Sequence, residues 1–372
     1  MRASAVAGLV LANANDKLLK KLTAHRSMAS VPYGARYRLI DFSLSNLVNA
    51  GISSVGIITK ENYRSLMDHV SSGLYWDLDR KIGGLYLLPP YSSKGAKRYT
   101  GTIDALNGAH DYLTHCKSDY IVICNGDVLA NVDISSAIEQ HIDKQADVTV
   151  VYHNGKLLSK SGETMVLSLN GENHVSNIEL DCKSTENVNF SIGITIIGRK
   201  LLTKLIEEAH GNDLASFNRD VLAKRFKKLK IYGFEHSDYV AFMSSTDSYY
   251  KTNMDLLDPQ IRHQLFNKQR PIYTKTRDDM PTRYGTKANV KNCLIGDGCV
   301  INGTVKNSIL FRGVTVEKGA VVENCILMQE TKVGAETQIS NVIADKNAVI
   351  SGGMVLKGTA TKHFFVQKNE IL

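Results

Sequence analysis

The sequence predicts an α/β domain followed by a parallel β-helix, and two patterns along its 372 residues support this. Up to about residue 246, apolar runs typical of buried strands alternate with segments that have helical periodicity, which favours a mostly parallel sheet covered on both faces. From about Gly285 onward, small apolar residues recur every five or six positions, with Gly, Asn and Asp between them. Such a hexapeptide repeat winds a parallel β-helix, in which each coil buries its apolar side chains on the next.

The expected elements follow in order along the chain. Strands are predicted at residues 5–12, 55–59, 120–124, 148–152 and 192–197, and helices at residues 43–50, 103–113, 135–144 and 217–228. Between the two domains, apolar residues at intervals of three to four positions predict a helix over residues 247–267, broken by Pro259. We therefore divide the chain into a domain at residues 1–246, a connector at 247–284 and a β-helix at 285–372.

Composition argues against several classes of protein. Six cysteines are scattered without close pairs, so neither a zinc site nor a disulfide framework is expected. No apolar run has the length of a signal segment or a membrane span, which predicts a cytoplasmic protein without membrane contact. The net charge of +8 comes from basic groups on separate elements with few aromatic residues among them, which argues against nucleic-acid binding. We expect most of these groups to be solvated, and the rest to bind anionic small molecules or an acidic partner.

Several segments resemble one enzyme family, in the same order and at compatible spacing. They are VPYGARYRLIDF at residues 31–42 with LSN at 44–46, WDLD at 76–79, LPPY at 88–91 and YTGTIDA at 99–105. These segments are similar to the glucose-1-phosphate adenylyltransferases, which make ADP-glucose for glycogen synthesis. The resemblance implies a Rossmann-like nucleotidyltransferase domain followed by a left-handed parallel β-helix.

The loop after the first predicted strand departs from the pattern of that family. Residues 11–23 contain no glycine, whereas a phosphate-binding turn needs exposed backbone N–H groups. Catalytic family members have Gly-Gly-x-Gly-x-Arg here, followed by Ala-Lys-Pro. In this chain the glycines fall on Asn13, Ala14 and Asp16, with Asn15 before the last, while the arginine falls on Leu18 and the lysine on Met28. We interpret residues 13–16 as a degenerate nucleotide loop, because Leu18 and Met28 cannot stabilise phosphate charge.

The metal site of the family is incomplete as well. Asp127 follows the strand predicted at 120–124 and matches the first carboxylate that holds Mg²⁺ in the family. The second carboxylate belongs to an Asp-Val-Gly-Thr segment, which here reads MSST, so that its aspartate has become Met243. Because Mg²⁺ prefers near-octahedral oxygen ligands, we expect Asp127 to be a vestigial ligand that does not bind Mg²⁺ productively. We therefore predict that no catalytic residue of the family is intact.

The sugar side of the predicted pocket is mixed. Family-like residues remain at Tyr99, Gly101, Thr102, Asp104, Asn125, Gly126, Asp127 and Ser191. The Glu-Lys-Pro motif that supplies a lysine to the sugar phosphate in the family is missing between residues 166 and 189, which argues against tight glucose-1-phosphate binding. The alternative for Gly101, Thr102 and Asp104 is a structural helix entry with a capping side chain.

One basic group has a more specific interpretation. His25 and Arg26 precede the altered segment, and Arg36 and Arg38 follow it. In the family, this neighbourhood contributes to sites for phosphorylated metabolites and to subunit contacts. The planar guanidinium of Arg suits a phosphate, because it can donate two parallel hydrogen bonds. We predict an effector or interface cluster at these four residues, with surface salt bridging as the alternative.

Taken with the resemblance, these departures predict a regulatory-type subunit with little or no catalysis of its own. It would modulate a homologous catalytic subunit within a homo- or hetero-tetramer and respond to a phosphorylated metabolite. An active sugar-1-phosphate nucleotidyltransferase with a non-standard loop is the main alternative. A hexapeptide-repeat acyltransferase is a further alternative, but it needs a histidine base, and His363 is the only histidine in the β-helix region.

Overall fold

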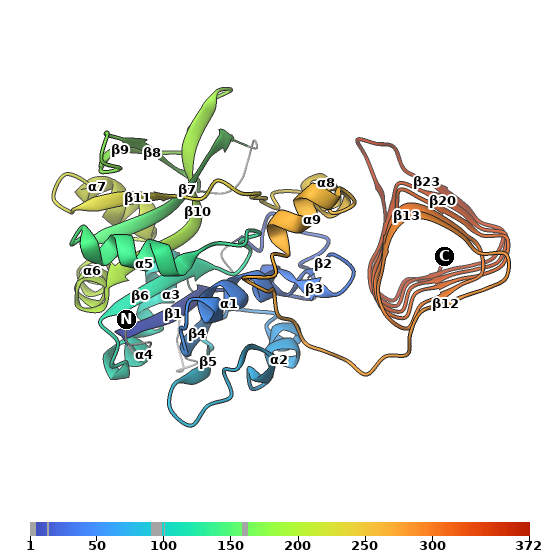
Figure 1. Cartoon of the computed structure of the whole chain (residues 1–372), viewed down its shortest axis with the longest axis horizontal. Helices are drawn as coiled ribbons and strands as arrows, with labels where there is room; N and C mark the ends of the chain where they lie inside the picture. Colours follow the sequence, from blue (N-terminus) through green and yellow to red (C-terminus); the bar gives the residue numbers. More distant parts are fainter. Residues whose placement is uncertain (1–4, 13–14, 91–98, 100, 158–162) are drawn as a thin grey trace.

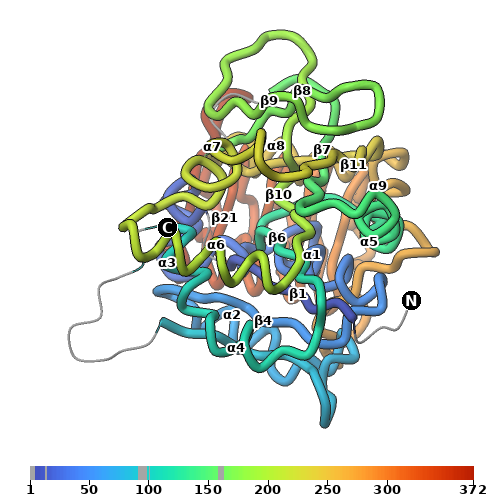
Figure 2. The backbone as a smooth tube through the Cα atoms, turned by 90° about the vertical axis from the view of Figure 1, so that its left-hand side faces the viewer, coloured from blue at the N-terminus to red at the C-terminus, as the bar shows by residue number. Residues whose placement is uncertain are grey.

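The computed structural model describes residues 5–12, 15–90, 99, 101–157 and 163–372, and two domains lie side by side in it (Figure 1). An α/β domain holds the first part of the chain, and a triangular prism of short strands holds the last part. Figure 2, which views the α/β domain from the side away from the prism, shows the strands of the prism behind it. This arrangement confirms the predicted fold class, a nucleotidyltransferase-type domain followed by a left-handed parallel β-helix.

The α/β domain is built on one nine-stranded sheet with a mostly parallel arrangement. Its main path runs β11 (Ile231–Glu235), β7 (Val148–Lys156), β10 (Asn187–Gly198), β6 (Tyr120–Asn125), β1 (Val6–Leu11), β4 (Ser54–Ile58) and β5 (Gly84–Leu88), and β8 (Met165–Leu169) and β9 (Val175–Leu180) extend from β10. On this path β10 is antiparallel to both neighbours, and the other pairings are parallel. All six residues of β1 are buried, as its continuous apolar run predicts for a strand covered on both faces.

Helices cover both faces of this sheet, and each face has its own core. On one face lie α1 (Leu39–Asn49), α2 (Arg64–Val70) and α5 (Ile134–Asp143), and on the other lie α3 (Thr102–Asn107), α4 (His110–His115) and α6 (Arg199–Gly211). The helix predicted at residues 103–113 is therefore two helices, separated at Gly108. Gly108 stands at this break, and a Cβ atom there would collide with the side chain of Tyr99, so no larger residue fits. The helix predicted at 217–228 is likewise a π-helical turn, η4 (Phe217–Leu222), followed by the short α7 (Ala223–Arg225).

Two helices connect the domains, where one broken helix was expected. α8 (Thr246–Asp255) begins at Ser245, whose side chain accepts a hydrogen bond from the backbone N–H of Ser248. α9 (Pro259–Leu265) begins at Pro259, with Asp258 as its N-cap. Both helices contribute to a hydrophobic cluster shared by the two domains, so the connector is part of the packing. This cluster includes Phe42, Tyr249, Leu256, Leu265, Phe311, Met328 and Ile343.

Coils of about 17 residues build the β-helix. One sheet contains β12 (Arg283–Tyr284), β14 (Val300–Ile301), β16 (Thr315–Val316), β19 (Lys332–Val333) and β22 (Val349–Ile350). The other contains β13 (Asn289–Ile295), β15 (Thr304–Leu310), β17 (Val321–Glu323), β18 (Ile326–Leu327), β20 (Gln338–Ser340), β21 (Val342–Ala344), β23 (Val355–Lys357) and β24 (Phe364–Val366). At one corner, Asn307, Asn324 and Asn341 have φ values of 45°, 51° and 52°, a left-handed conformation that Asn tolerates better than most residues.

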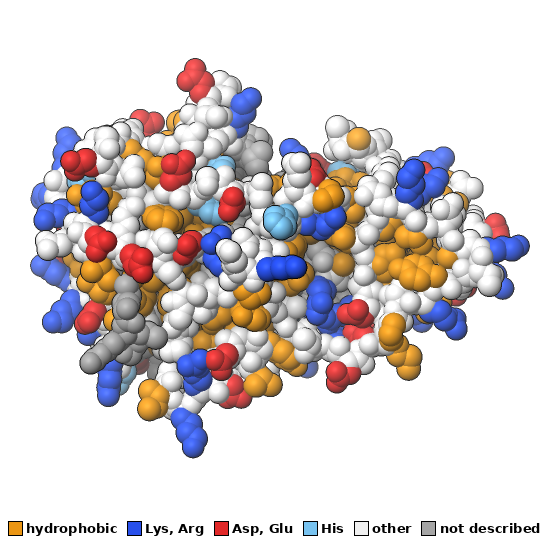
Figure 3. Space-filling model, in the orientation of Figure 1, with side chains coloured by type: hydrophobic (Ala, Val, Ile, Leu, Met, Phe, Trp, Pro, Cys, Tyr) orange, Lys and Arg blue, Asp and Glu red, His pale blue; other side chains and the backbone are white. Residues whose placement is uncertain are grey.

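Charged side chains of both signs are interspersed over the face of the α/β domain that Figure 3 shows. This distribution agrees with the expectation that most basic groups of the chain are solvated. Among the helices of the described ranges, none combines the length and the apolar composition that a bilayer crossing requires.

Candidate functional site

A first cavity lies at the carboxyl ends of β1 and β6, where open α/β sheets present their ligand-binding groups. Its volume is about 130 Å³. Predicted site residues that line it are Asn15, Leu18, Thr102, Asn125, Asp127, Ser191 and Met243. The structure therefore brings the degenerate loop, the vestigial carboxylate and the methionine that replaces the second carboxylate into one place. Asn13 and Ala14 lie outside the described residues.

Asp127 is the buried carboxylate of this cavity, and the degenerate loop already occupies it. The side chain of Asn15 donates a hydrogen bond from Nδ2 to Oδ2 of Asp127 at 2.6 Å. Burial raises the pKa of Asp127, and the bond from Asn15 opposes this shift. An amide donor thus faces the oxygen that would have to face a cation. In the part of the chain that the structure describes, no group of three or more His, Cys, Asp or Glu side chains could hold a metal ion.

Asp16 closes the same loop on itself. Its Oδ1 accepts the backbone N–H of Met28 at 2.6 Å, at the start of the short helix η2 (Met28–Ser30). Its backbone carbonyl accepts the hydroxyl of Thr23 at 2.7 Å. A carboxylate therefore holds a backbone amide close to the position where a phosphate-binding loop would offer such amides to an anion.

The side chains that replace the charged groups of the family are packed or apolar. Met28 is 1% exposed and Met243 is 2% exposed, and both belong to the hydrophobic cluster shared by the two domains. Leu18 and Met243 form part of the cavity wall, whereas Met28 does not reach it. The position of the catalytic lysine is thus part of the interdomain core. None of these three side chains can stabilise a phosphate.

Several residues predicted for the sugar side have structural surroundings instead. Gly101 is the N-cap of α3, where a Cβ atom would collide with the backbone of Ala215. The hydroxyl of Thr102 accepts the backbone N–H of Phe217 at 2.9 Å. Asp104 lies 3.4 Å from the imidazole of His210. Tyr99, Gly101, Asp104 and Gly126 do not line the cavity.

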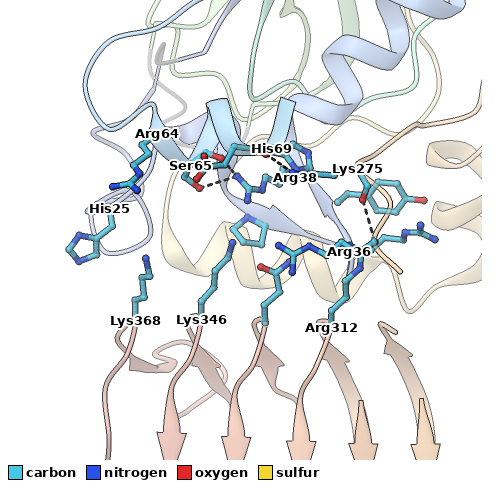
Figure 4. A pocket seen from close by; sticks show the side chains of 15 residues that line it. His25, Arg36, Arg38, Arg64, Ser65, His69, Lys275, Arg312, Lys346 and Lys368 are labelled. Carbon is cyan, nitrogen blue, oxygen red and sulfur yellow. Dashed lines mark hydrogen bonds between the residues drawn. The ribbon is translucent and has the colours of Figure 1, made fainter. Parts of the chain in front are cut away.

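A second cavity lies between the two domains and is strongly basic (Figure 4). Its volume is about 460 Å³, which suits a small metabolite. Eight Lys or Arg side chains line it together with two histidines, and Asp68 is its one acidic lining residue within the described ranges. The cations are Arg36, Arg38, Arg64, Lys275, Arg277, Arg312, Lys346 and Lys368, and the histidines are His25 and His69.

Three separate parts of the chain surround this cavity. The β2 (Pro32–Tyr33) and β3 (Tyr37–Arg38) hairpin and α2 form its α/β side, and Lys275 and Arg277 come from the segment between the domains. On the β-helix side, Arg312, Lys346 and Lys368 stand in one column along the tops of the coils (Figure 4). Gln329 also lines the cavity, and backbone hydrogen bonds place it on the coil between Arg312 and Lys346. Backbone hydrogen bonds between coils fix that column. The N–H groups of Glu330, Asn347 and Asn369 donate to the carbonyls of Arg312, Gln329 and Lys346, respectively.

The charge in this cavity is largely uncompensated. In the described ranges, Arg36, Arg64, Lys346 and Lys368 form no ion pair with a carboxylate. Burial lowers the pKa of Lys346 to about 6, and repulsion by Arg38 and Arg26 adds to this effect. Burial also lowers the pKa of Arg38 to about 10. An anion at this position would relieve the repulsion, which makes the cavity a candidate phosphate site.

The predicted basic cluster is only partly brought together. His25, Arg36 and Arg38 line the cavity, whereas Arg26 does not. Arg26 is 2% exposed, and its Nη2 donates to the two carboxylate oxygens of Asp345 at 2.7 and 3.0 Å. It is an interdomain tie rather than a free cation. The other six cations were not predicted from the sequence, although Arg312 and Lys346 stand 34 positions apart, which corresponds to two coils.

His363, the histidine that an acyltransferase would need, lies at the domain contact. Its ring stacks on Tyr250 with a centroid distance of 3.7 Å, and Nδ1 lies 3.0 Å from Asp247. The side chain is 2% exposed, so the imidazole offers no accessible base.

Comparison with known proteins agrees with this architecture. The Nucleotidyl transferase family matches residues 7–162, and the family described as GlmU-like, C-terminal hexapeptide matches residues 279–369. Glucose-1-phosphate adenylyltransferases of Bacillus thuringiensis (strain Al Hakam) and Bacillus mycoides (strain KBAB4) are each 35% identical to this chain over 357 residues, which covers 94% of both chains. That of Bacillus anthracis is 34% identical over the same length. The chain therefore belongs to the glucose-1-phosphate adenylyltransferase family.

Proposed function

We propose that this chain is a regulatory-type subunit of a glucose-1-phosphate adenylyltransferase in glycogen synthesis, with little or no activity of its own. It would assemble with a homologous catalytic subunit, as a tetramer, and modulate that subunit. The observation that carries this proposal is the first cavity, where Leu18 and Met243 form the wall and Asn15 holds Asp127.

Nucleotidyl transfer depends on groups that this cavity lacks. Catalysis of phosphoryl chemistry is mostly positioning and stabilisation of charge, and removal of one stabilising donor commonly costs roughly 10²–10³ in rate. Nucleotidyl transferases generally use Mg²⁺. The residues present do not fit that ion, because Asp127 is bound by an amide donor and Met243 offers no oxygen. The losses concern one reaction centre, so they need not add, but together they leave no efficient catalyst.

The basic cavity supports a regulatory role. A phosphorylated metabolite bound there would contact the α/β domain, the interdomain segment and the β-helix at once. A ligand that touches several parts of a chain favours the arrangement in which those parts meet, and this preference is the source of an allosteric coupling free energy. The effector class we propose is therefore a small phosphorylated anion.

An active enzyme remains the second candidate, since the relatives named glucose-1-phosphate adenylyltransferase are 35% identical over nearly the whole chain. A test should measure pyrophosphate release from ATP and glucose 1-phosphate for the chain alone, for the homologous catalytic subunit alone and for both together. We expect no release above background from the chain alone, and altered rate or effector response in the mixture.

The variant Lys346→Met is the matched variant, because it alters the basic cavity and leaves the first cavity intact. It should keep assembly with the partner but weaken the response to a phosphorylated effector. Release from the chain alone at rates usual for metabolic enzymes, about 1–10³ per second, would contradict the proposal. If the two subunits are shown to form a complex but the rate and effector response of the catalytic subunit stay unchanged, the regulatory role would be contradicted.

A further inference from the structure

The first cavity differs sharply in charge from the second. Its ionisable lining residues in the described ranges are Asp127 and Glu163, and no Lys or Arg lines it there. A sugar phosphate would bring its dianion close to Asp127, whose bound donor is the neutral amide of Asn15, and to Glu163, which has the guanidinium of Arg219 at 3.9 Å outside the cavity lining. Like charges repel one another at such close approach, and a partly buried site screens this repulsion less than water does.

The polar groups of the cavity suit hydroxyl groups. In the part of the chain that the structure describes, the side-chain amides of Asn125 and Asn218 have no hydrogen-bond partner and face the cavity. The hydroxyl of Ser191 accepts the backbone N–H of Gly193 at 3.2 Å and keeps its own proton to donate. Amides and hydroxyls both donate and accept, as the hydroxyl groups of a sugar do. Gly193 is required here, since with φ at 82° a Cβ atom would stand 2.7 Å from the amide of Asn125.

Apolar side chains form the rest of the wall. Phe217 is 5% exposed, Phe242 is half-buried, and Leu18 and Met243 lie where the family places charge. Aromatic and aliphatic surfaces can pack against the C–H face of a pyranose ring. The cavity volume of about 130 Å³ is below the range usual for drug-sized ligands and favours a small one.

We infer that this cavity binds an uncharged hexose, as free sugar or as the end of a glucan chain, in preference to a sugar phosphate. The inference rests on the proposed loss of catalysis, because an active centre would have to hold the sugar phosphate. With Leu18 and Met243 in its wall, the first cavity would then bind neutral sugar, while the basic cavity would bind anions.

Saturation-transfer difference NMR on the whole chain tests this with methyl α-D-glucopyranoside and with maltotriose. We expect a signal from the glucoside that is lost in Asn218→Leu and kept in Lys346→Met. A stronger response to maltotriose identifies a glucan end as the source, and an equal response identifies the free sugar. Glucose 1-phosphate is also able to enter the basic cavity, so its direct binding signal would not identify the site. Its ability to displace the glucoside is measured instead, because that displacement reports on the first cavity. Glucose 1-phosphate should displace the glucoside only at roughly tenfold higher concentration than glucose does.

Three results would overturn the inference. They are the absence of any signal from both sugars, a signal that Asn218→Leu leaves unchanged, and displacement by glucose 1-phosphate at the same or lower concentration than glucose. The proposed function would survive each of them, because it is measured by pyrophosphate release and by the response of the catalytic partner. Conversely, catalysis by the chain alone would refute the proposed function whatever the sugar signals are.

Discussion

The ion pair between Arg26 and Asp345 offers the most demanding test of how the two domains are held together. Arg26 precedes η2 in the α/β domain, and Asp345 follows β21 in the β-helix. Both residues are 2% exposed, and the guanidinium donates to both carboxylate oxygens. Charges buried to this degree are stable only as a pair, because each has given up its hydration.

The expected magnitude follows from what remains after one partner is removed. Removal of one member of a buried pair costs about 3–5 kcal/mol of unfolding free energy. In Arg26→Met the carboxylate of Asp345 keeps the backbone N–H of Lys346, which Oδ1 accepts at 2.7 Å. We therefore expect a loss near the lower end, about 3 kcal/mol. The double variant Arg26→Met with Asp345→Leu should recover all but about 1 kcal/mol, since both new side chains are apolar and Met328 lies within 4.0 Å of Arg26.

Urea denaturation of the whole chain, followed by fluorescence and by circular dichroism, measures these differences. Lys224→Ala is the control, because its ion pair with Asp220 is on the surface and its loss should cost less than about 1 kcal/mol. A double variant no more stable than Arg26→Met would refute the reasoning, because an apolar pair would then have failed to replace the charged one. A loss below about 1 kcal/mol in the single variant would refute it as well.

Three further predictions concern the two cavities and the β-helix corner. Because the pKa of Lys346 is lowered to about 6, its amine is mostly neutral at pH 7–8, and a bound phosphate should raise this pKa. Phosphate binding at pH 7–8 should therefore take up protons, and the affinity should fall from pH 6 to pH 8. Calorimetry in buffers of different ionisation enthalpy measures the uptake, which should be smaller in Lys346→Met. Restoration of family residues with Leu18→Arg, Met28→Lys, Met243→Asp and glycines at positions 13, 14 and 16 should raise pyrophosphate release above that of the natural chain, and an unchanged rate would show that other losses dominate. Asn307→Ala should reduce unfolding free energy by about 1 kcal/mol because φ is 45° there, whereas Asn307→Gly should stay within about 0.5 kcal/mol in the same urea titration.

Local pattern predicted much of the fold. The apolar run of β1 is buried along its whole length, and the apolar residues of the β-helix repeat form one core inside the coils. The spacing of apolar residues in the sequence is therefore enough to indicate both structures. The division of residues 103–113 into α3 and α4 at Gly108 is not encoded in the apolar period of that segment, which continues across the break. The antiparallel place of β10 in the sheet depends on pairing that no local period encodes.

The candidate sites divide in the same way. Leu18 and Met243 were found because the family has charged residues at both positions, and the fold then brings them to one wall. Of the residues that line the basic cavity, the sequence predicted only His25, Arg36 and Arg38, which lie close together along the chain. Its remaining cations come from elements up to several hundred positions away, and only the packing of the β-helix on the α/β domain unites them. Arg26 lies outside this cavity because it is buried and paired with Asp345, and the local sequence does not distinguish such an arginine from a free one.

The contrast between the two cavities is itself an argument about function. Unpaired cations around a cavity repel one another, and although burial is the main reason that the pKa of Lys346 is lowered, repulsion by Arg38 and Arg26 adds to the shift. The unliganded protein would be more stable without this repulsion. The cluster of unpaired cations is therefore best explained by an anion that offsets their charge when it binds. The first cavity has no lining cation in the described ranges: Asp127 accepts from the amide of Asn15, Glu163 accepts from the hydroxyl of Ser216 and lies 3.9 Å from Arg219, and the rest of the wall mixes neutral polar and apolar side chains. We therefore propose that phosphate recognition in this chain belongs to the interface between its domains rather than to the carboxyl ends of its central strands, because an anion bound there would contact both domains at once.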